Sequence, residues 1–282
     1  MKVSTTPPER STRRDRRRYL IWGTTLGLGL WQSAARAGLG DAGPLKMGVE
    51  SALMISGLAL HLKKGIGADL GLPVTLMPAP SLTLLDQLQA GEVDVAITQA
   101  PEREAGLEQQ GLAFFAKTIG HGRYVLAGTG ADAAGVQGHQ DVVQALSDIA
   151  RVGQAGGCTF VAASEPDGTR EMEKTLWKAV GPRPLGRWMQ PAPAQALGIL
   201  QTLRQLQAQK QSAYGLVEQG VWLAQGGKPL TICVEGDARL DAPYRIASSY
   251  RTQHPAAKFI CGYLGGASGH RLVERFGHGY HA

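Results

Sequence analysis

Hydrophobic and polar positions follow two rhythms along the chain, and the order of these rhythms predicts an α/β fold. Short apolar runs of strand type are followed by longer stretches with apolar residues three and four positions apart, which is helical spacing. In the first series we predict strands at 45–49, 73–77 and 93–98, with helices at 56–70 and 81–90 between them. Strands that alternate with helices in this way form a parallel sheet with helices on both faces.

Two extended segments then follow one another without a helix between them, at 114–118 and 124–127, and this break predicts a crossing into a second lobe. A second α/β series runs from Asp141 to about Val234. Its predicted elements are helices at 141–151, 169–180 and 194–207 and strands at 158–162, 214–217 and 230–234. An extended segment at 244–247 and helices at 255–264 and 268–276 follow, and we expect them to return to the first lobe.

Two α/β lobes joined by two extended crossings predict a clamshell, with the ligand site in the cleft where strand ends meet helix N-termini. The expected boundaries are residues 38–118 plus 238–282 for one lobe and 119–237 for the other. The turn at Gly168-Thr169 joins a predicted strand to a predicted helix, an arrangement that favours anion binding. Alternatively, this turn only begins a helix.

The first 37 residues are predicted to be an export signal. A basic segment ends in Arg16-Arg17-Arg18-Tyr19-Leu20, a Gly- and Leu-rich apolar stretch follows to Trp31, and Ala35-Arg36-Ala37 offers the small residues that a signal peptidase requires. The order Arg-Arg-x-aromatic-Leu resembles a twin-arginine signal, which implies a periplasmic protein cleaved after Ala37. The alternative is an uncleaved anchor, but the apolar run is shorter than the roughly 20 residues that a span needs.

The basic character of the chain lies in this leader. The formal net charge is +6, and residues 1–37 carry eight basic and two acidic side chains. The other residues carry 21 basic and 21 acidic side chains, so this part of the chain is formally neutral. A neutral body does not suit a phosphate backbone, and we predict no nucleic-acid partner.

The sequence after the leader has no recognisable catalytic motif. It contains no P-loop, no strand-linked dinucleotide fingerprint, no HExxH and no GxSxG, and none of its histidines belongs to a catalytic set with supporting local context. Cys158, Cys233 and Cys261 form no CxxC pair; they provide either one disulfide and a thiol or three small buried residues. The His-containing tail at 277–281 could bind a metal adventitiously, but we expect it to be frayed. We therefore predict a protein that is not an enzyme and has no cofactor and no bound metal.

Several segments in a fixed order carry a resemblance to a known family. They are Leu88–Ala96 with Gln99–Glu102, Gly168-Thr169, Leu176–Gly181, Ala213–Gly220, Glu235–Asp237 and Asp241–Tyr244. In this order and spacing the chain resembles the tungstate-binding periplasmic proteins of ABC importers, a branch of the type 2 periplasmic-binding-protein fold that is related to the molybdate binders. The resemblance covers about residues 45–265 and implies an α/β, two-lobed clamshell in which each lobe is a mainly parallel sheet flanked by helices.

The resemblance also implies which residues contact the ligand. In that family an oxyanion is held by hydroxyl groups and main-chain amides at helix N-termini, with the help of one arginine. Such donors replace the hydration shell of the ion, and the helix dipoles favour its negative charge. Carried over position by position, the resemblance implies ligand contacts from Ser51, Ser81, Gly168 and Thr169.

The site departs from the family's pattern at each turn. Where the family has consecutive threonines and a serine, this chain has Val49–Ala52, which includes Glu50 and keeps one hydroxyl at Ser51. The second turn, usually a threonine between glycines, reads Pro80-Ser81-Leu82. In the third turn the family's arginine is replaced by Ala163, and Pro191–Gln195 replaces a glycine-rich segment. Hydrogen-bond donors and the fixed cation are therefore lost.

Glu50 and Arg170 bear on the identity of the ligand, and each has two interpretations. A carboxylate within about 4 Å of a dianion costs roughly 4 kcal/mol per charge at an effective dielectric constant of 20, so Glu50 in the cleft favours an amine or a metal cation. On a solvent-facing rim, Glu50 would only cap its helix. Arg170 is either a replacement cation in the site or a solvated surface charge paired along its helix.

The sequence thus predicts a monomeric, periplasmic solute-binding component of an ABC importer, of the tungstate- and molybdate-binding branch, with a permease as its partner. The bound ligand is a small molecule or an oxyanion, and its identity is left open by the departures at the site. The alternative is a non-transport accessory or sensor protein on the same fold that binds a different small ligand, a metal cation or a protein. An enzyme would require a histidine within hydrogen-bond reach of Glu50 and Asp167.

Overall fold

The structure is a computed structural model that describes residues 42–181 and 186–282. The predicted export signal, residues 1–37, lies outside the described residues. Within the part of the chain that is described, no helix has the length and apolar character needed to cross a membrane. Residues 44–282 belong to one unit, which carries all of the features discussed below.

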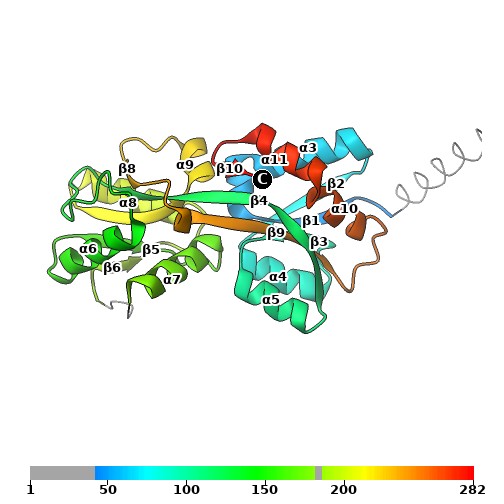
Figure 1. Cartoon of the computed structure of the whole chain (residues 1–282), viewed down its shortest axis with the longest axis horizontal. Helices are drawn as coiled ribbons and strands as arrows, with labels where there is room; N and C mark the ends of the chain where they lie inside the picture. Colours follow the sequence, from blue (N-terminus) through cyan, green and yellow to red (C-terminus); the bar gives the residue numbers. More distant parts are fainter. Residues whose placement is uncertain (1–41, 182–185) are drawn as a thin grey trace, which may run out of the picture. The chain divides into compact units, whose positions relative to one another are not determined.

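A mixed sheet runs through this unit (Figure 1). Its strands are β1 (Leu45–Glu50), β2 (Val74–Ala79), β3 (Val95–Thr98), β4 (Ala113–Gly128), β5 (Thr159–Ala162), β6 (Met189–Pro191), β7 (Ala213–Glu218), β8 (Thr231–Val234), β9 (Asp241–Ser249) and β10 (Tyr280–His281). The strand order is β2-β1-β3-β9-β4-β7-β5-β6, and β8 and β10 also pair with β4. The long strand β4 is therefore the element to which both halves of the sheet attach.

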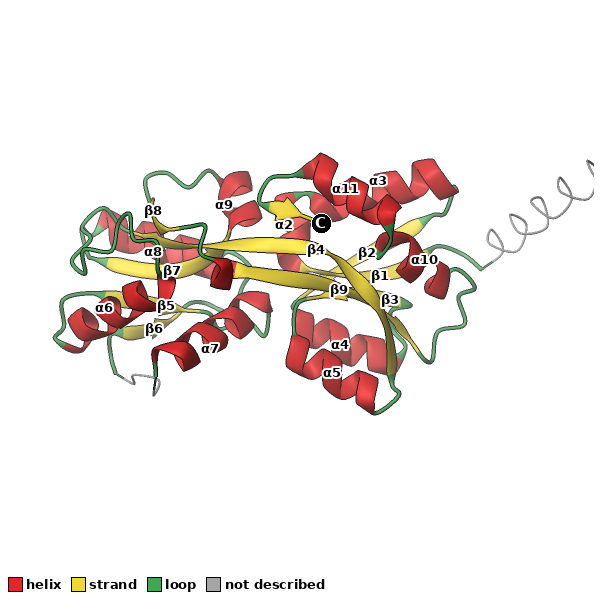
Figure 2. Ribbon diagram, viewed as in Figure 1, coloured by secondary structure: helices red, strands yellow, loops and turns green. Residues whose placement is uncertain are grey.

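Helices flank the two halves of the sheet in two groups (Figure 2). They are α2 (Ser51–Ser56), α3 (Leu58–Leu70), α4 (Ser81–Ala90), α5 (Pro101–Gln109), α6 (Val142–Gln154), α7 (Gly168–Val180), α8 (Gly198–Ala208), α9 (Gln219–Gln225), the 3-10 turn η1 (Ala238–Leu240), α10 (Ala257–Leu264) and α11 (Ala267–Phe276). We call lobe I the elements β1–β3, β10, α2–α5, α10 and α11. Lobe II contains β5–β8 and α6–α9, and β4 and β9 connect the lobes.

The strand pairing confirms the predicted two-lobed α/β clamshell. In lobe I, β1 pairs in parallel with β2 and β3, and β3 pairs antiparallel with β9. In lobe II, β5 pairs in parallel with β6 and β7. Along β4, residues 113–123 pair with β9, and residues 124–128 pair with β7. The change of partner after Arg123 is the point where β4 passes from one lobe into the other.

The period-two pattern of β5 shows how the strands of lobe II are buried. Successive side chains of a strand point to opposite faces of the sheet. Phe160 accordingly belongs to one apolar cluster and Val161 to another. The ring of Phe160 packs edge-on against Trp177 of α7, with ring centroids 5.1 Å apart. The helix that begins at Gly168 is thereby fixed to the sheet by its apolar face.

The structure corrects three details of the predicted organisation. The crossing predicted as two segments is the single strand β4. The helix predicted from Ser56 begins at Leu58, because Gly57 has a φ of 92° and separates it from the short helix α2. The tail at 277–281 is not frayed, since Tyr280 and His281 pair with β4 as β10 and Tyr280 is buried.

The three cysteines agree with the second of their two interpretations. Cys158, Cys233 and Cys261 are buried, and none of them forms a disulfide. Burial raises the pKa of Cys158 to about 11 and that of Cys261 to about 12, which keeps both thiols protonated near neutral pH. They therefore act as small apolar residues of the core.

Candidate functional site

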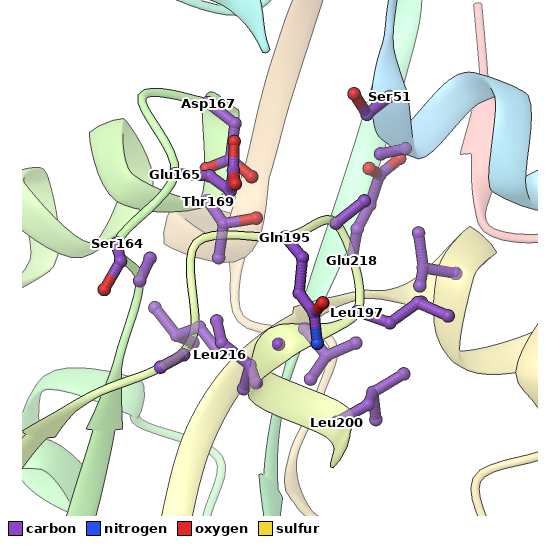
Figure 3. Close-up of a pocket in the computed structure, with 18 of the residues that line it drawn as sticks. Ser51, Ser164, Glu165, Asp167, Thr169, Gln195, Leu197, Leu200, Leu216 and Glu218 are labelled. Carbon is purple, nitrogen blue, oxygen red and sulfur yellow. The ribbon is translucent and has the colours of Figure 1, made fainter. Parts of the chain in front are cut away.

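The candidate site is a small cavity between lobe I and lobe II (Figure 3). Its wall is formed by Ser51 and Ala52 of α2, by the loop before α7, by the segment before α8 and by the end of β7. The free volume is about 50 Å³. One water molecule needs about 10–15 Å³ on this measure, so the cavity has room for a few waters or a small ion.

Four transitions from strand to helix bring main-chain amides toward this region. The strands β1, β2, β5 and β7 are followed directly or within a short turn by α2, α4, α7 and α9. The first N–H groups of a helix have no partner within the helix, so they are available to an acceptor at its N-terminus. In α4 and α7, which have 10 and 13 residues, the helix dipole adds a favourable field for negative charge.

Glu50 occupies the position between the N-termini of α4 and α7. It is the last residue of β1, and it is only 2% exposed. The Ser81 hydroxyl donates a hydrogen bond to Glu50 Oε2 and accepts one from the Gln99 N–H at 2.9 Å. The backbone N–H groups of Ser81 and Gly168 also donate to the Glu50 carboxyl group and lower its pKa. The chain thus presents its own carboxyl group to donors of the kind that bind an anion.

Burial outweighs these donors in setting the protonation of Glu50. Removal from water raises the pKa of Glu50 well above its ordinary value, and the charges of Asp167 and Glu218 raise it further. Burial likewise raises the pKa of Glu218 to about 7 and that of Asp167 to about 6. The charge of Asp167 raises the pKa of both Glu50 and Glu218, and the charge of Glu165 raises that of Asp167, so these carboxyl groups form an acidic cluster that disfavours full ionisation.

Two tyrosines stabilise the ionised form of Glu218 against this burial. The Tyr244 hydroxyl donates to Glu218 Oε2 at 2.9 Å, and it lowers the pKa of Glu218. The Tyr280 hydroxyl, which donates to Ser56 Oγ at 2.8 Å, also interacts with Glu218 and lowers its pKa. Tyr280 belongs to β10, so the C-terminal strand supports one wall of the cavity.

Direct contacts join the two lobes beside the carboxyl cluster. The Leu82 N–H of α4 donates to the Pro166 carbonyl oxygen at 3.0 Å. The Tyr124 hydroxyl of β4 donates to Gln99 Oε1. A Cβ atom at Gly168 would lie 2.3 Å from Gln99 Oε1 and 3.1 Å from Gln99 Cβ, so a larger residue there would require the Gln99 side chain to move.

The structure brings most of the predicted site residues together. Ser51 and Thr169 line the cavity, whereas Ser81 and Gly168 lie at the helix N-termini beside Glu50. The interpretation of Glu50 as a cap on a solvent-facing rim is wrong, because the side chain is buried and makes no capping hydrogen bond to α2. Arg170 is exposed and lines a separate surface depression next to Ala163 and Trp177.

Among the polar lining residues that sequence reasoning did not assign to the site are Glu165, Gln195 and Glu218. Glu218 lies at the end of β7 directly before α9, just as Glu50 lies at the end of β1 directly before α2. The same signal, a carboxylate at the junction of a buried strand and a helix, therefore identifies both residues. Asp167, predicted only as part of the third turn, caps α7 through a hydrogen bond from the Arg170 N–H at 3.1 Å.

The charges around the cavity are all of one sign. Glu165 and Asp167 line it from lobe II on one side, and Glu218 lies opposite them near Ser51 (Figure 3). Among the described residues that line the cavity there is no lysine, arginine or histidine. Where these carboxyl groups are ionised, their field favours positive charge in the cavity.

Comparisons with known proteins place the chain in a fold family. A family model described as the PBP superfamily domain matches residues 46–253. The tungstate ABC transporter structure from Geobacter sulfurreducens is similar with 24% identity and a TM-score of 0.71, covering 83% of this chain and 98% of that one. The tungstate binding protein TupA from Desulfovibrio alaskensis G20 has 24% identity and a TM-score of 0.66, covering 82% and 93%. No curated protein matches the sequence. The comparisons confirm the resemblance at the level of the fold.

We expect the buried carboxyl groups to make the protein less stable as the pH rises from about 4.5 to about 7. In this range the folded protein retains a proton on Glu218 that the unfolded chain has lost, so rising pH favours unfolding. The change in pKa from 4.5 to about 7 corresponds to about 3 kcal/mol. Glu218→Gln should remove this part of the pH dependence.

Urea unfolding at pH 5 and pH 8 gives the free energy of unfolding of the wild type and of Glu218→Gln. The difference between the two proteins cancels the contributions of the other titrating groups. Glu92→Gln is the matched control, because Glu92 is exposed. If the free energy of unfolding changed equally with pH in the wild type and in Glu218→Gln, then Glu218 would have the same pKa in the folded and the unfolded chain. This result would contradict the prediction.

Proposed function

The chain belongs to the PBP superfamily, and from this membership we propose that it is a periplasmic solute-binding protein that delivers a small ligand to the permease of an ABC importer. The proposal is supported by the match over residues 46–253 and by the cavity between the lobes. The predicted twin-arginine signal, cleaved after Ala37, would bring the folded chain to the periplasm.

The proposed protein is a monomer that binds by closure of its two lobes. The boundaries that we propose from the sequence are residues 38–118 plus 238–282 for one lobe and residues 119–237 for the other, so the first boundary lies a few residues before β4 changes its partner after Arg123. The two strands that connect the lobes, β4 and β9, are the elements about which a hinge motion would occur. Solute binding between the lobes would then present the ligand to the permease in the closed form.

The observation that carries the identity of the ligand is the position of Glu50. The fold is similar to that of tungstate-binding proteins, and the resemblance implies that this family holds an oxyanion at helix N-termini. Here the Ser81 hydroxyl and the amides of Ser81 and Gly168 already interact with the Glu50 carboxyl group. An oxyanion would have to displace Glu50 or lie beside it, and it would favour the protonated form of Glu50, because an ionised Glu50 beside it costs roughly 4 kcal/mol per charge.

The ligand that fits this wall is a small cation, either an amine or a metal ion. The carboxyl groups of Glu165, Asp167 and Glu218 line a free volume of about 50 Å³, which limits the ligand to a few heavy atoms. A cation would favour the ionised forms of Asp167 and Glu218, so its binding should release protons near neutral pH. In this proposal Glu50 takes the place of the anion of the family, and the ligand binds next to it.

A second candidate function is a non-transport accessory or sensor protein on the same fold. It is favoured by the contact of Glu50 with the N-termini of α4 and α7, because the chain then satisfies the donors of both helices with its own side chain. Such a protein would close its lobes without a solute. Small-angle scattering that gives the same radius of gyration with and without every solute tested would favour it over a transporter component.

We expect removal of the Glu50 side chain to restore anion binding. In Glu50→Ala the donors of Ser81 and Gly168 lose their acceptor, and tungstate or formate should raise the melting temperature. At 100 times the Kd the stabilisation is about 2.7 kcal/mol, or roughly 5–10 °C for a domain of this size. Wild type and Glu50→Gln, which keeps the shape of the side chain, should show no shift with either anion.

Glu50→Ser serves as a second variant if the alanine variant does not fold, since a serine hydroxyl can still join the donors. A shift with tungstate in the wild type that equals the shift in Glu50→Ala would show that Glu50 does not compete with the anion. The proposed loss of oxyanion binding would then be wrong, and the fold would be unaffected.

We expect the wild type to be stabilised by a small cation. Ammonium, methylammonium, ethanolamine and divalent metal ions form a suitable panel, read out as a shift in melting temperature at pH 7.5. Glu218→Gln, which removes a charge from the cavity wall, should reduce the shift, and the exposed-site control Glu92→Gln should keep it. Equal shifts in the two variants would contradict binding at the cavity.

A further inference from the structure

A second group of ligating side chains lies where the C-terminal strand meets the strands that join the lobes. His121 belongs to β4, Asp241 is the first residue of β9, and His281 belongs to β10. In the antiparallel pairing His281 is opposite His121, and Asp241 is opposite Arg123. Directly paired residues share a face of the sheet, and so do residues two apart on one strand. The side chains of His121, Asp241 and His281 therefore project from the same face.

The distances within this group suit a common metal ion. His121 Nδ1 lies 2.9 Å from Asp241 Oδ2, and His281 Nε2 lies 3.6 Å from the same oxygen. One ligating atom from each residue lies within 4.8 Å of the other two. Bonds of about 2.0–2.2 Å to a tetrahedral ion place its ligands roughly 3.4 Å apart. The observed separations therefore need only small side-chain movements to match a bound ion.

Two atoms of the group have no other role in the structure. Asp241 Oδ1 and His281 Nδ1 are buried and have no hydrogen-bond partner among the described residues. The three side chains are each about one-third exposed, at 34%, 29% and 32%. A hydrogen-bonded His–Asp pair alone would leave Asp241 Oδ1 unsatisfied, and this is the atom that a bound ion would satisfy. A metal ion can draw on the free carboxylate oxygen and still keep a water ligand from solvent.

The surroundings of the group allow a positive ion. Arg123 lines the same surface depression and opposes a cation, but its side chain is exposed. Glu235 and Asp237 line the depression with the opposite charge, and Asp237 is paired with Arg239 at 2.6 Å. The local charges therefore do not exclude a divalent ion, which itself is the strongest charge at such a site.

We propose that His121, Asp241 and His281 bind a divalent transition-metal ion, for which Zn²⁺ is the probe of choice. Two imidazoles and one carboxylate are ligands that suit zinc, copper or nickel, whereas Ca²⁺ and Mg²⁺ prefer all-oxygen sites. The bound ion connects β10 to β4 and β9 next to the point where β4 passes between the lobes. This site is separate from the cavity, and its proposal does not rest on the proposed transport function.

The test is calorimetric titration of the mature protein with Zn²⁺ after treatment with a chelator. The wild type is expected to bind one equivalent. His121→Ala, Asp241→Asn and His281→Ala should each lower the affinity at least about 10-fold, since even the loss of an outer-shell partner costs 10- to 100-fold. His278→Ala is the matched control, because this exposed histidine lies in the same tail outside the group and should leave the affinity unchanged.

A second readout separates loss of a ligand from loosening of the tail. Co²⁺ in a low-coordinate site with nitrogen ligands gives intense visible bands, which should appear in the wild type and in His278→Ala and disappear in His281→Gln. Absence of a one-to-one complex with Zn²⁺, Cu²⁺ or Ni²⁺ in the wild type would overturn the proposal. So would Zn²⁺ binding that survives His281→Ala and is lost in Glu218→Gln, since the ion would then lie in the cavity.

Discussion

The carboxyl group of Glu50 is held by donors from both lobes, and the electrostatics of the cleft depend on this contact. The Ser81 hydroxyl and amide come from lobe I, whereas the Gly168 amide comes from lobe II. Because the group is buried beside Asp167 and Glu218, its ionisation is opposed by burial and by like charge, even though two helix dipoles favour it. A single side chain thus connects the closure of the lobes with the protonation of the cluster.

The contrast between scaffold and site has a simple physical origin. The fold rests on apolar strands and helix faces distributed over the whole unit, and many substitutions of similar volume preserve such cores. The ligand site rests on a few residues at strand ends. In our proposal, replacing a hydroxyl by the Glu50 carboxyl group and the family's arginine by Ala163 reverses the preferred charge of the ligand without disturbing the sheet. The chain can therefore share the fold of tungstate-binding proteins and bind a different solute.

The sequence predicted the elements with strong hydrophobic periodicity. It missed the polar helix α5 and the contacts between residues that are distant in sequence. Helix α4 was predicted with its exact bounds, since Pro80 and Gly91 mark its ends. Helix α5 was missed because it is rich in Glu and Gln and buries only Glu104 and Leu107. For Glu50 the sequence left two interpretations open, because burial depends on how two lobes meet. The metal ligands His121, Asp241 and His281 are distant in sequence, so only the pairing of β4 with β9 and β10 reveals them.

The central claim is that the Glu50 carboxyl group, and not a bound oxyanion, occupies the N-termini of α4 and α7. The most direct measurement is anomalous X-ray scattering from tungsten in crystals of the wild-type protein grown with millimolar tungstate at neutral pH. The account predicts no tungsten peak within hydrogen-bond distance of the Ser81 and Gly168 amides, with density for the Glu50 carboxyl group in that position. A tungsten peak between these amides, with Glu50 turned away, would contradict it.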